Sequence, residues 1–211
     1  VALGGGSCLA EFPELCGAEG NILSRCVNFS DKEKFMLLMK DYEQKANSEG
    51  VSIADNPSPG NIRDGLITDA IKSTGASKKG GSAPIIAVKE YGEQMPDSGL
   101  SLVCTPGNDL EAVTGQVAAG ANLILFSTGL GTPTGNPITP VIKIATNSKV
   151  AVKLADMIDF DCGPIIEGKS LDNVADNLLE VIIASASGNY EVKADRLEQY
   201  DFMFWERNTS L

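Results

Sequence analysis

Residues 101–135 read SLVCTPGNDLEAVTGQVAAGANLILFSTGLGTPTG, and this stretch decides the fold that we expect. Its two short apolar runs, 102–104 and 122–126, predict buried strands. Between the runs, residues 109–119 carry apolar side chains at helical spacing. A strand, a helix and a strand in this order form a βαβ unit, which predicts a parallel sheet and a right-handed crossover.

Polar turns follow both predicted strands. The first turn covers 105–109, where Asn108 or Asp109 serves as the N-cap of the helix, and the second covers 128–132. Ligands of parallel α/β sheets bind outside the carboxyl ends of the strands, where both turns should lie. The stretch therefore predicts a site for a small polar ligand.

The rest of the chain continues this alternation of strands and helices. Ser30 and Glu33 form a capping-box pattern, which predicts that an amphipathic helix begins here and extends to about residue 48. The C-terminal tail is rich in aromatic residues and is expected to pack on the body of the protein or on a partner. We expect a body of residues 1–195 and a tail of 196–211. Further strands are expected at 8–12, 85–88, 141–145 and 157–160, and further helices at 20–26, 62–73, 148–155 and 170–185.

The composition excludes several function classes. A net charge of −11 argues against nucleic acid or an anionic membrane as a partner, and no apolar run is long enough to span a bilayer. Five cysteines without a CxxC pair indicate a reducing, cytoplasmic compartment. The chain starts with Val1, which suggests a piece of a longer protein whose upstream domains are absent.

Familiar catalytic motifs are missing from the sequence. There is no GxGxxG and no GxxxxGK[ST], and because the chain contains no histidine it has no Ser-His-Asp or Cys-His site. These absences count against nicotinamide binding, nucleotide hydrolysis and standard hydrolase chemistry. Any metal site in this chain must use oxygen, thiolate or amine ligands.

Three features remain as candidate chemistry, each with a structural alternative. Glu14 and Glu19 follow the predicted strand 8–12 on a Pro- and Gly-rich loop, where their carboxylates can hold a divalent cation. The structural alternative is that Glu19 starts a helix and interacts favourably with its dipole. The tripeptide Pro-Gly-Asn occurs at 59–61 and at 106–108 and suits a carboxylate or phosphate, or serves only as a turn before an N-cap. Lys79 can reach an anionic ligand or remain solvated.

Several motifs occur in a fixed order along nearly the whole chain. They are Glu11-Phe12-Pro13-Glu14, Gly17-Ala18-Glu19, Asn56-Pro57-Ser58-Pro59-Gly60-Asn61, 79–83, Pro106-Gly107-Asn108-Asp109, Ala119-Gly120-Ala121-Asn122, Ser127-Thr128-Gly129, Gly131-Thr132-Pro133, 143–148 and 158–163. Together they resemble the C-terminal portion of the altronate/galactarate (sugar-acid) dehydratase family. The ending, 201–211, is similar to that of altronate dehydratases.

The resemblance implies an α/β, Rossmann-like, mostly parallel sheet with helices on both faces. It also implies a metal-dependent lyase of carbohydrate metabolism, which removes water from a hydroxylated sugar acid to give a 2-keto-3-deoxy acid. The metal is Fe²⁺ in most members, with Mn²⁺ or Mg²⁺ as alternatives, and the other partners are the upstream domains and a possible second copy in a homodimer. The candidates carried over are Glu14 and Glu19 for metal, Lys79 and Lys143 for catalysis, and Asn61, Asn108, Asp109, Thr128, Gly129, Gly131 and Asn147 for substrate.

The chain departs from the family pattern at three positions. Leu130 stands where members usually carry Arg, Ile62 stands for Lys, and Ala70 stands for a carboxylate. An Arg-to-Leu change removes a bidentate clamp for a carboxylate. Two alternatives therefore stay open: a divergent, non-catalytic ligand-binding or assembly domain, and a related lyase such as a sulfolactate sulfo-lyase.

Overall fold

The structure is a computed structural model that describes residues 3–53, 59–63 and 65–206. The chain divides into two compact units. The first comprises Val1–Ala121 with Met203–Leu211, and the second comprises Asn122–Phe202. The boundary at residue 121 falls inside the stretch that we expected to form one βαβ unit. The expected division into a body of 1–195 and a tail of 196–211 stays a prediction.

The sheet of the first unit has three parallel strands. They are β1 (Gly6–Leu9), β2 (Ile85–Lys89) and β3 (Gly99–Val103), in the order β1-β3-β2. The central strand β3 pairs on both edges, since Leu102 faces Leu9 on one side and Val88 on the other. No edge of β3 remains for the next strand of the chain. The prediction that 101–135 form one βαβ unit in a single sheet is therefore wrong.

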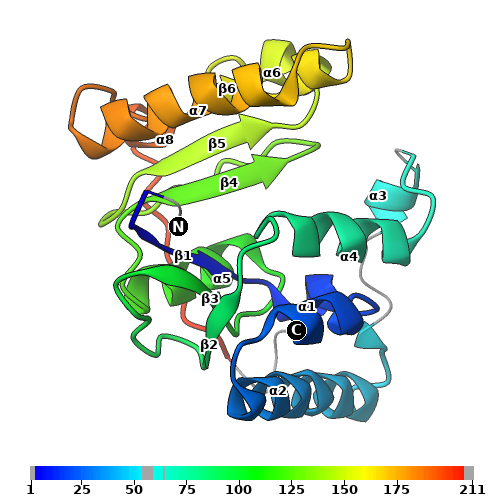
Figure 1. The fold of residues 1–211 in the computed structure, drawn as a ribbon. Coiled ribbons are helices and arrows are strands. Elements are labelled where there is room, and N and C mark those ends of the chain that lie inside the picture. The colour runs from blue at the N-terminus through cyan, green and yellow to red at the C-terminus, as the bar shows by residue number, and fades with distance from the viewer. Residues whose placement is uncertain (1–2, 54–58, 64, 207–211) are drawn as a thin grey trace. The chain divides into compact units, whose positions relative to one another are not determined.

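The helices of the first unit surround a core of large apolar side chains. Phe12 and Phe35 meet edge to face with ring centroids 5.4 Å apart, and both are fully buried. The helices are η1 (Phe12–Leu15), α1 (Glu19–Arg25), α2 (Phe29–Ser48), α3 (Pro59–Arg63), α4 (Asp69–Lys78) and α5 (Asp109–Ala118) (Figure 1).

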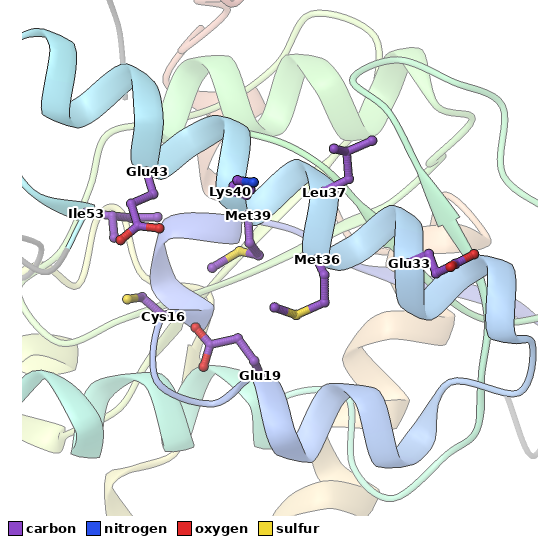
Figure 2. Close-up of a pocket in the computed structure, with 9 residues that line it drawn as sticks. All are labelled: Cys16, Glu19, Glu33, Met36, Leu37, Met39, Lys40, Glu43 and Ile53. Atoms are coloured by element: carbon purple, nitrogen blue, oxygen red, sulfur yellow. The ribbon is translucent and has the colours of Figure 1, made fainter.

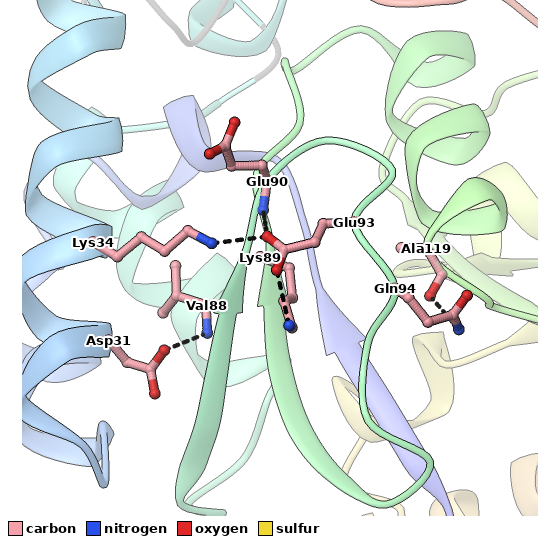
Figure 3. Close-up of polar contacts among 8 residues, drawn as sticks. All are labelled: Asp31, Lys34, Val88, Lys89, Glu90, Glu93, Gln94 and Ala119. Atoms are coloured by element: carbon pink, nitrogen blue, oxygen red, sulfur yellow. Dashed lines mark hydrogen bonds and ion pairs between the residues drawn. The ribbon is translucent and has the colours of Figure 1, made fainter.

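Helix α2 protects the outer edge of β2 (Figure 3). Asp31 Oδ1 accepts the backbone N–H of Val88 at 3.0 Å, which satisfies a donor on an edge strand. Just beyond β2, Glu93 lies between Lys34 at 2.8 Å and Lys89 at 2.9 Å. Burial alone would raise the pKa of Glu93, but these two hydrogen bonds and one from the Glu90 backbone lower it to about 2.

Several boundaries of helices and strands that were predicted from local sequence patterns differ from those in the structure. Helix α2 begins at Phe29 after Asn28, so the predicted capping box at Ser30 is wrong. The predicted helix 62–73 is also wrong, because residues 66–68 separate α3 from α4 and Thr68 Oγ1 caps α4 by accepting the N–H of Ile71 at 3.2 Å. Strand β1 ends at Leu9, before the expected residue 12.

The second unit holds another parallel sheet, with β4 (Ile124–Thr128), β5 (Val141–Ala145) and β6 (Phe160–Asp161) in that order. The run predicted at 141–145 is strand β5. The predicted strand 157–160 is shifted, because the Ile158 N–H turns back to the Leu154 carbonyl before β6 begins. The helices of this unit are α6 (Ser148–Lys153), η3 (Gly163–Ile165), α7 (Leu171–Ala186) and α8 (Lys193–Arg196).

The α/β class with parallel strands is confirmed by both sheets, and the arrangement is Rossmann-like. At the end of the described chain, Trp205 stacks on Tyr42 of α2, with ring centroids 5.2 Å apart and planes 10° apart. None of the helices that the structure describes has an apolar stretch long enough to cross a bilayer.

Candidate functional site

Two loops meet at the carboxyl ends of the neighbouring strands β1 and β3. The backbone N–H of Glu11 donates to Thr105 Oγ1 at 2.9 Å, and that of Phe12 donates to the Thr105 carbonyl at 3.1 Å. Glu11 itself takes a left-handed conformation with φ 62° and ψ 66°, which a non-glycine residue rarely adopts. Strained backbone of this kind is often found at functional sites, so the Glu11 carboxylate is a candidate functional group.

The Glu11 carboxylate lies within a cluster of charges. Lys79 Nζ is 3.9 Å from Glu11 Oε2, and the Glu11 side chain is 22% exposed. Burial raises the pKa of Glu11 to about 7, with Glu14 and Asp109 adding to the rise while Lys79 and Lys72 oppose it. A carboxyl group with this pKa can both accept and donate a proton near neutral pH.

Lys79 owes its position to the end of α4, which Arg25 of α1 holds in place. The guanidinium of Arg25 donates to the backbone carbonyls of Ser77 at 3.1 Å, Gly80 at 2.7 Å and Ala83 at 3.1 Å. A planar guanidinium that binds three carbonyls fixes the loop firmly. The prediction that Lys79 can reach an anion is compatible with this placement, and its catalytic role stays a prediction.

The predicted metal ligands contact groups of the protein. Glu14 Oε1 forms an ion pair with Lys72 Nζ at 2.5 Å, and Glu19 Oε1 accepts the N–H of Gly17 at 2.8 Å. Within the described residues, no group of three or more Cys, Asp or Glu side chains is arranged to hold a metal ion. A cation at Glu14 must also displace Lys72. These residues alone therefore do not fit a complete metal site, and we derive no chemical step through a metal.

The two Pro-Gly-Asn turns differ in the structure. Asn108 is exposed and caps α5, since its Oδ1 accepts the N–H of Leu110 at 3.2 Å, as in the structural alternative. Asn61 lies inside the short helix α3 rather than before a helix. Asp109 is the first residue of α5, and its charge contributes to raising the pKa of Glu11. Whether Asn61, Asn108 or Asp109 contacts a substrate stays a prediction.

The carboxyl end of the second sheet carries the remaining polar candidates. Thr128 Oγ1 accepts the N–H of Gly131 at 2.9 Å, and Asn147 Nδ2 donates to the Gly129 carbonyl at 3.1 Å. Gly131 has φ 94°, and a Cβ there would overlap the side chain of Leu154. These contacts bring Thr128, Gly129, Gly131 and Asn147 together. That they share one pocket with Asn61 and Asn108 stays a prediction.

Lys143 is fully buried in the middle of β5. Its Nζ donates to Gln199 Oε1 at 2.6 Å and to the Pro133 carbonyl at 3.3 Å. Burial lowers the pKa of Lys143, while nearby Asp159 and Asp195 oppose the shift. Contact with a substrate requires these two hydrogen bonds to open, so a structural role explains Lys143 directly and its catalytic role stays a prediction.

Sequence reasoning missed Glu11 and Lys72 as members of the charged cluster. The available signal was an acidic residue near the carboxyl end of the strand predicted at 8–12, at Glu11. The three departures from the family pattern all fall on exposed positions: Leu130 is 54% exposed, Ile62 is 60% exposed, and Ala70 is exposed on α4. None of these substitutions disturbs a core.

The fold and this cluster define an α/β domain of parallel sheets with acid–base groups at the strand ends. A profile of the family described as "D-galactarate/Altronate dehydratase, C-terminal" matches residues 1–210. The chain therefore belongs to the D-galactarate/altronate dehydratase C-terminal family.

Relatives of known name agree with this assignment. The altronate dehydratase of Escherichia coli is 39% identical over 188 residues, 89% of this chain and 38% of the relative. The galactarate dehydratase (L-threo-forming) of the same organism is 32% identical over 89% of this chain and 36% of the relative. The (2R)-sulfolactate sulfo-lyase subunit beta of Chromohalobacter salexigens is 29% identical over 92% of this chain and 50% of the relative. This chain thus spans half or less of each of these proteins.

Proposed function

We propose that the protein containing this chain is a cytoplasmic hydro-lyase that removes water from a hydroxylated sugar acid of the altronate or galactarate type. The product is a 2-keto-3-deoxy acid. Support comes from the family membership and from relatives named altronate and galactarate dehydratases. The structural observation that carries the proposal is the pair formed by Glu11, which follows β1 and is tied to Thr105 after β3, and Lys79, which follows α4.

The chemistry of dehydration explains why this pair matters. Removal of a proton next to a carboxylate creates an enediolate dianion, so the site needs a base and a nearby positive charge. The Glu11 carboxylate accepts the proton next to the substrate carboxylate, and Lys79, 3.9 Å from Glu11, neutralises that carboxylate. The protonated Glu11 then donates to the neighbouring hydroxyl, whose C–O bond breaks to release water, and the enol that remains becomes the 2-keto acid. Thr105 positions Glu11 through its backbone, and Arg25 positions Lys79 through the loop after α4.

Thr128, Gly129, Gly131 and Asn147, at the carboxyl end of the second sheet, are proposed as residues that bind polar groups of a ligand. Thr128 and Asn147 organise the turn after β4 by hydrogen bonds to Gly131 and Gly129. Hydroxyl and amide groups at a strand end suit a polyhydroxylated acid, which offers both donors and acceptors. Leu130 in place of the family's Arg removes a candidate bidentate clamp for a carboxylate, so which acid is accepted has to be measured.

A divalent ion, Fe²⁺ by the family resemblance, belongs to the proposal as a cofactor of the whole protein. Glu14 and Glu19 contribute to its binding only together with ligands outside the described residues, since the described carboxylates do not form a set of three. Other domains of the same protein are the expected partners.

A substrate panel tests the proposal. The full-length protein, reduced and supplied with Fe²⁺ without oxygen, is offered altronate, galactarate and sulfolactate separately. Formation of a 2-keto acid from altronate supports the proposal. Release of sulfite from sulfolactate, with no reaction of either sugar acid, overturns it in favour of the second candidate.

That second candidate, a sulfo-lyase, is favoured by one specific observation. The relative named as a sulfo-lyase subunit matches 92% of this chain, against 89% for each of the two dehydratases, although its identity of 29% is lower than their 39% and 32%. Both reactions abstract a proton next to a carboxylate and expel a neighbouring group, so the same Glu11–Lys79 pair serves either. The identity of the leaving group separates them. A folded, Fe²⁺-loaded protein that reacts with no member of the panel contradicts both candidate activities on these substrates.

A further inference from the structure

The first unit has a groove of ≈ 700 Å³ along helix α2 (Figure 2). Met39 lines the groove but is only 6% exposed, and Figure 2 shows Leu37 on the opposite side of α2 from Met36. The groove therefore presents no continuous apolar surface to a ligand. The second unit holds a buried charge, Lys143, whose surroundings are more specific.

The connection between β4 and β5 has an unusual construction. It comprises residues 129–140, and none of these residues, all of which the structure describes, belongs to a helix or a strand. We call this segment the crossover. Neighbouring parallel strands are usually joined through a helix, as α6 joins β5 to β6 in the same sheet. Long connections without secondary structure are uncommon in compact domains and are often functional.

The crossover is polar and largely buried. Thr132, Thr134, Asn136 and Thr139 are each at most 7% exposed. The hydroxyl groups of Thr132 and Thr134 share a hydrogen bond of 2.8 Å, and Asn136 Oδ1 accepts the N–H of Ile138 at 3.0 Å. Buried backbone outside helices and sheets depends on side chains for its hydrogen bonds. The conformation of the crossover is thus set by the groups that bind it.

Lys143 supplies such a group from the middle of β5. Its side chain is fully buried, and its Nζ donates to the Pro133 carbonyl at 3.3 Å and to Gln199 Oε1 at 2.6 Å. Gln199 follows α8, and a Cβ at Gly135 would overlap the Gln199 backbone carbonyl, so the crossover packs directly against this residue. A buried ammonium is costly unless it is hydrogen-bonded. These bonds tie together the crossover, β5 and the segment after α8.

The crossover begins in the turn 128–131, which carries candidate ligand-binding groups. Thr128 Oγ1 accepts the N–H of Gly131 at 2.9 Å. Gly131 lies only two residues before Pro133, so a movement of the Pro133 carbonyl also moves this turn. Lys143 can therefore control the turn without touching a ligand.

We propose that Lys143 is a positioning residue, which together with Gln199 fixes the crossover and holds the turn 128–131 in the conformation that binds the substrate. In this role the ammonium keeps its two hydrogen bonds during the reaction and exchanges no proton with the substrate. The choice of a sugar acid as the ligand rests on the proposed function. The fixation of the crossover does not.

Amide hydrogen exchange of the full-length protein tests the fixation without any substrate. Lys143→Met keeps the length of the side chain and removes its donors, so exchange at 129–136 should become about tenfold faster or more. Exchange in α7 should stay unchanged, which excludes a general loss of stability. Lys169→Met, at an exposed lysine of the same unit, is the matched control and should exchange as the unchanged protein does.

Variants of Gln199 separate the hydrogen bond from packing. Gln199→Leu removes the acceptor of Lys143 and should accelerate exchange at 129–136 in the same way. Gln199→Glu keeps an acceptor oxygen for the ammonium and should exchange nearly as the unchanged protein does.

Kinetics with altronate then separate positioning from proton transfer. In the full-length protein with Fe²⁺, Lys143→Met should raise KM about tenfold and lower kcat by less than about threefold, because only the binding turn is loosened. Loss of a group that transfers the proton would instead lower kcat by about a hundredfold or more with little change in KM. Gln199→Glu should have a KM within about threefold of that of the unchanged protein.

Two results overturn the proposal. The first is unchanged exchange at 129–136 in a folded Lys143→Met variant or, where that variant does not fold, equal exchange in Gln199→Leu and Gln199→Glu. The second is a loss of kcat of about a hundredfold with unchanged KM in Lys143→Met, because Lys143 then takes part in the reaction itself.

Failure of the proposed function has a different signature. Neither the unchanged protein nor any variant then forms product from altronate, while exchange at 129–136 still responds to Lys143→Met. That result removes the sugar acid from the proposal and confirms the fixation of the crossover by Lys143.

Discussion

Glu11 and Thr105 are 94 residues apart in the sequence, yet the backbone N–H of Glu11 donates to the buried Thr105 hydroxyl oxygen at 2.9 Å. This contact ties the loop after β1 to the loop after β3 and holds Glu11 in its left-handed conformation. The position of the proposed acid–base group thus depends on the side chain of Thr105.

Replacing Thr105 by Val tests this dependence. The change keeps the shape but leaves the Glu11 N–H without its acceptor in a buried place, so the free energy of unfolding should fall by about 1–3 kcal/mol. Chemical denaturation measures the change. Thr105→Ser keeps the hydroxyl and should retain most of the stability, and equal losses in Ser and Val variants would show that the hydrogen bond is unimportant.

The raised pKa of Glu11 predicts a pH dependence of stability. The pKa rises from 4.5 to about 7 on folding, so ionisation opposes the folded state. Stability due to this group is full below pH 4.5, is lost as the pH rises to about 7, and amounts to at most about 3 kcal/mol.

Denaturation at several pH values in this window checks that prediction. Glu11→Gln cannot ionise and should flatten the curve, whereas Glu180→Gln on the exposed face of α7 should follow the unchanged protein. A curve for Glu11→Gln that is parallel to that of the unchanged protein contradicts the assigned pKa.

Gly131 and Gly129 offer a matched pair in the turn after β4. Gly131→Ala should destabilise by about 1–3 kcal/mol, because φ is 94° and the new Cβ would overlap Leu154. Gly129→Ala places its Cβ 3.5 Å from Thr146 Oγ1, an ordinary contact, and should change stability by less. Thermal unfolding of both variants measures the two losses of stability. A larger loss for Gly129→Ala than for Gly131→Ala would show that the turn has another conformation.

Trp205 anchors the end of the described chain on the first unit. Besides stacking on Tyr42, it lies 5.6 Å from the Tyr91 ring, so Trp205→Ala should lower the free energy of unfolding by about 2–3 kcal/mol. The neighbouring Phe204 is 68% exposed, and Phe204→Ala should have a much smaller effect. Similar effects of both changes on chemical denaturation would show that the aromatic stack contributes little.

The sequence predicted elements well where local pattern decides and poorly where distant pairing decides. Strand β5 was predicted correctly because the residues of Val141–Ala145 are apolar, with Lys143 as the exception. All five residues are buried in the structure, Lys143 included. The sheet that β4 joins could not be predicted, because β3 gains both of its partners, β1 and β2, from segments earlier in the chain.

The candidate site shows the same limit. The segment that carries Glu14 and Glu19 was identified by its composition, although Glu14 lies in η1 and Glu19 in α1 rather than on a loop. The pairing of Glu14 with Lys72 depends on how α4 packs against η1. The pKa of Glu11 depends on burial and on Lys79 and Asp109, which only the fold brings near it. Sequence patterns indicate which groups are available, and packing determines their charge states.

The central claim is that the Glu11–Lys79 pair carries out proton abstraction in a sugar-acid dehydratase. The most direct measurement is the rate of 2-keto-3-deoxy acid formation from altronate by the full-length protein with Fe²⁺, compared between the unchanged protein, Glu11→Gln and Glu180→Gln. The account predicts that Glu11→Gln lowers kcat by about a hundredfold or more while Glu180→Gln does not. A Glu11→Gln variant that forms product at the unchanged rate contradicts the account.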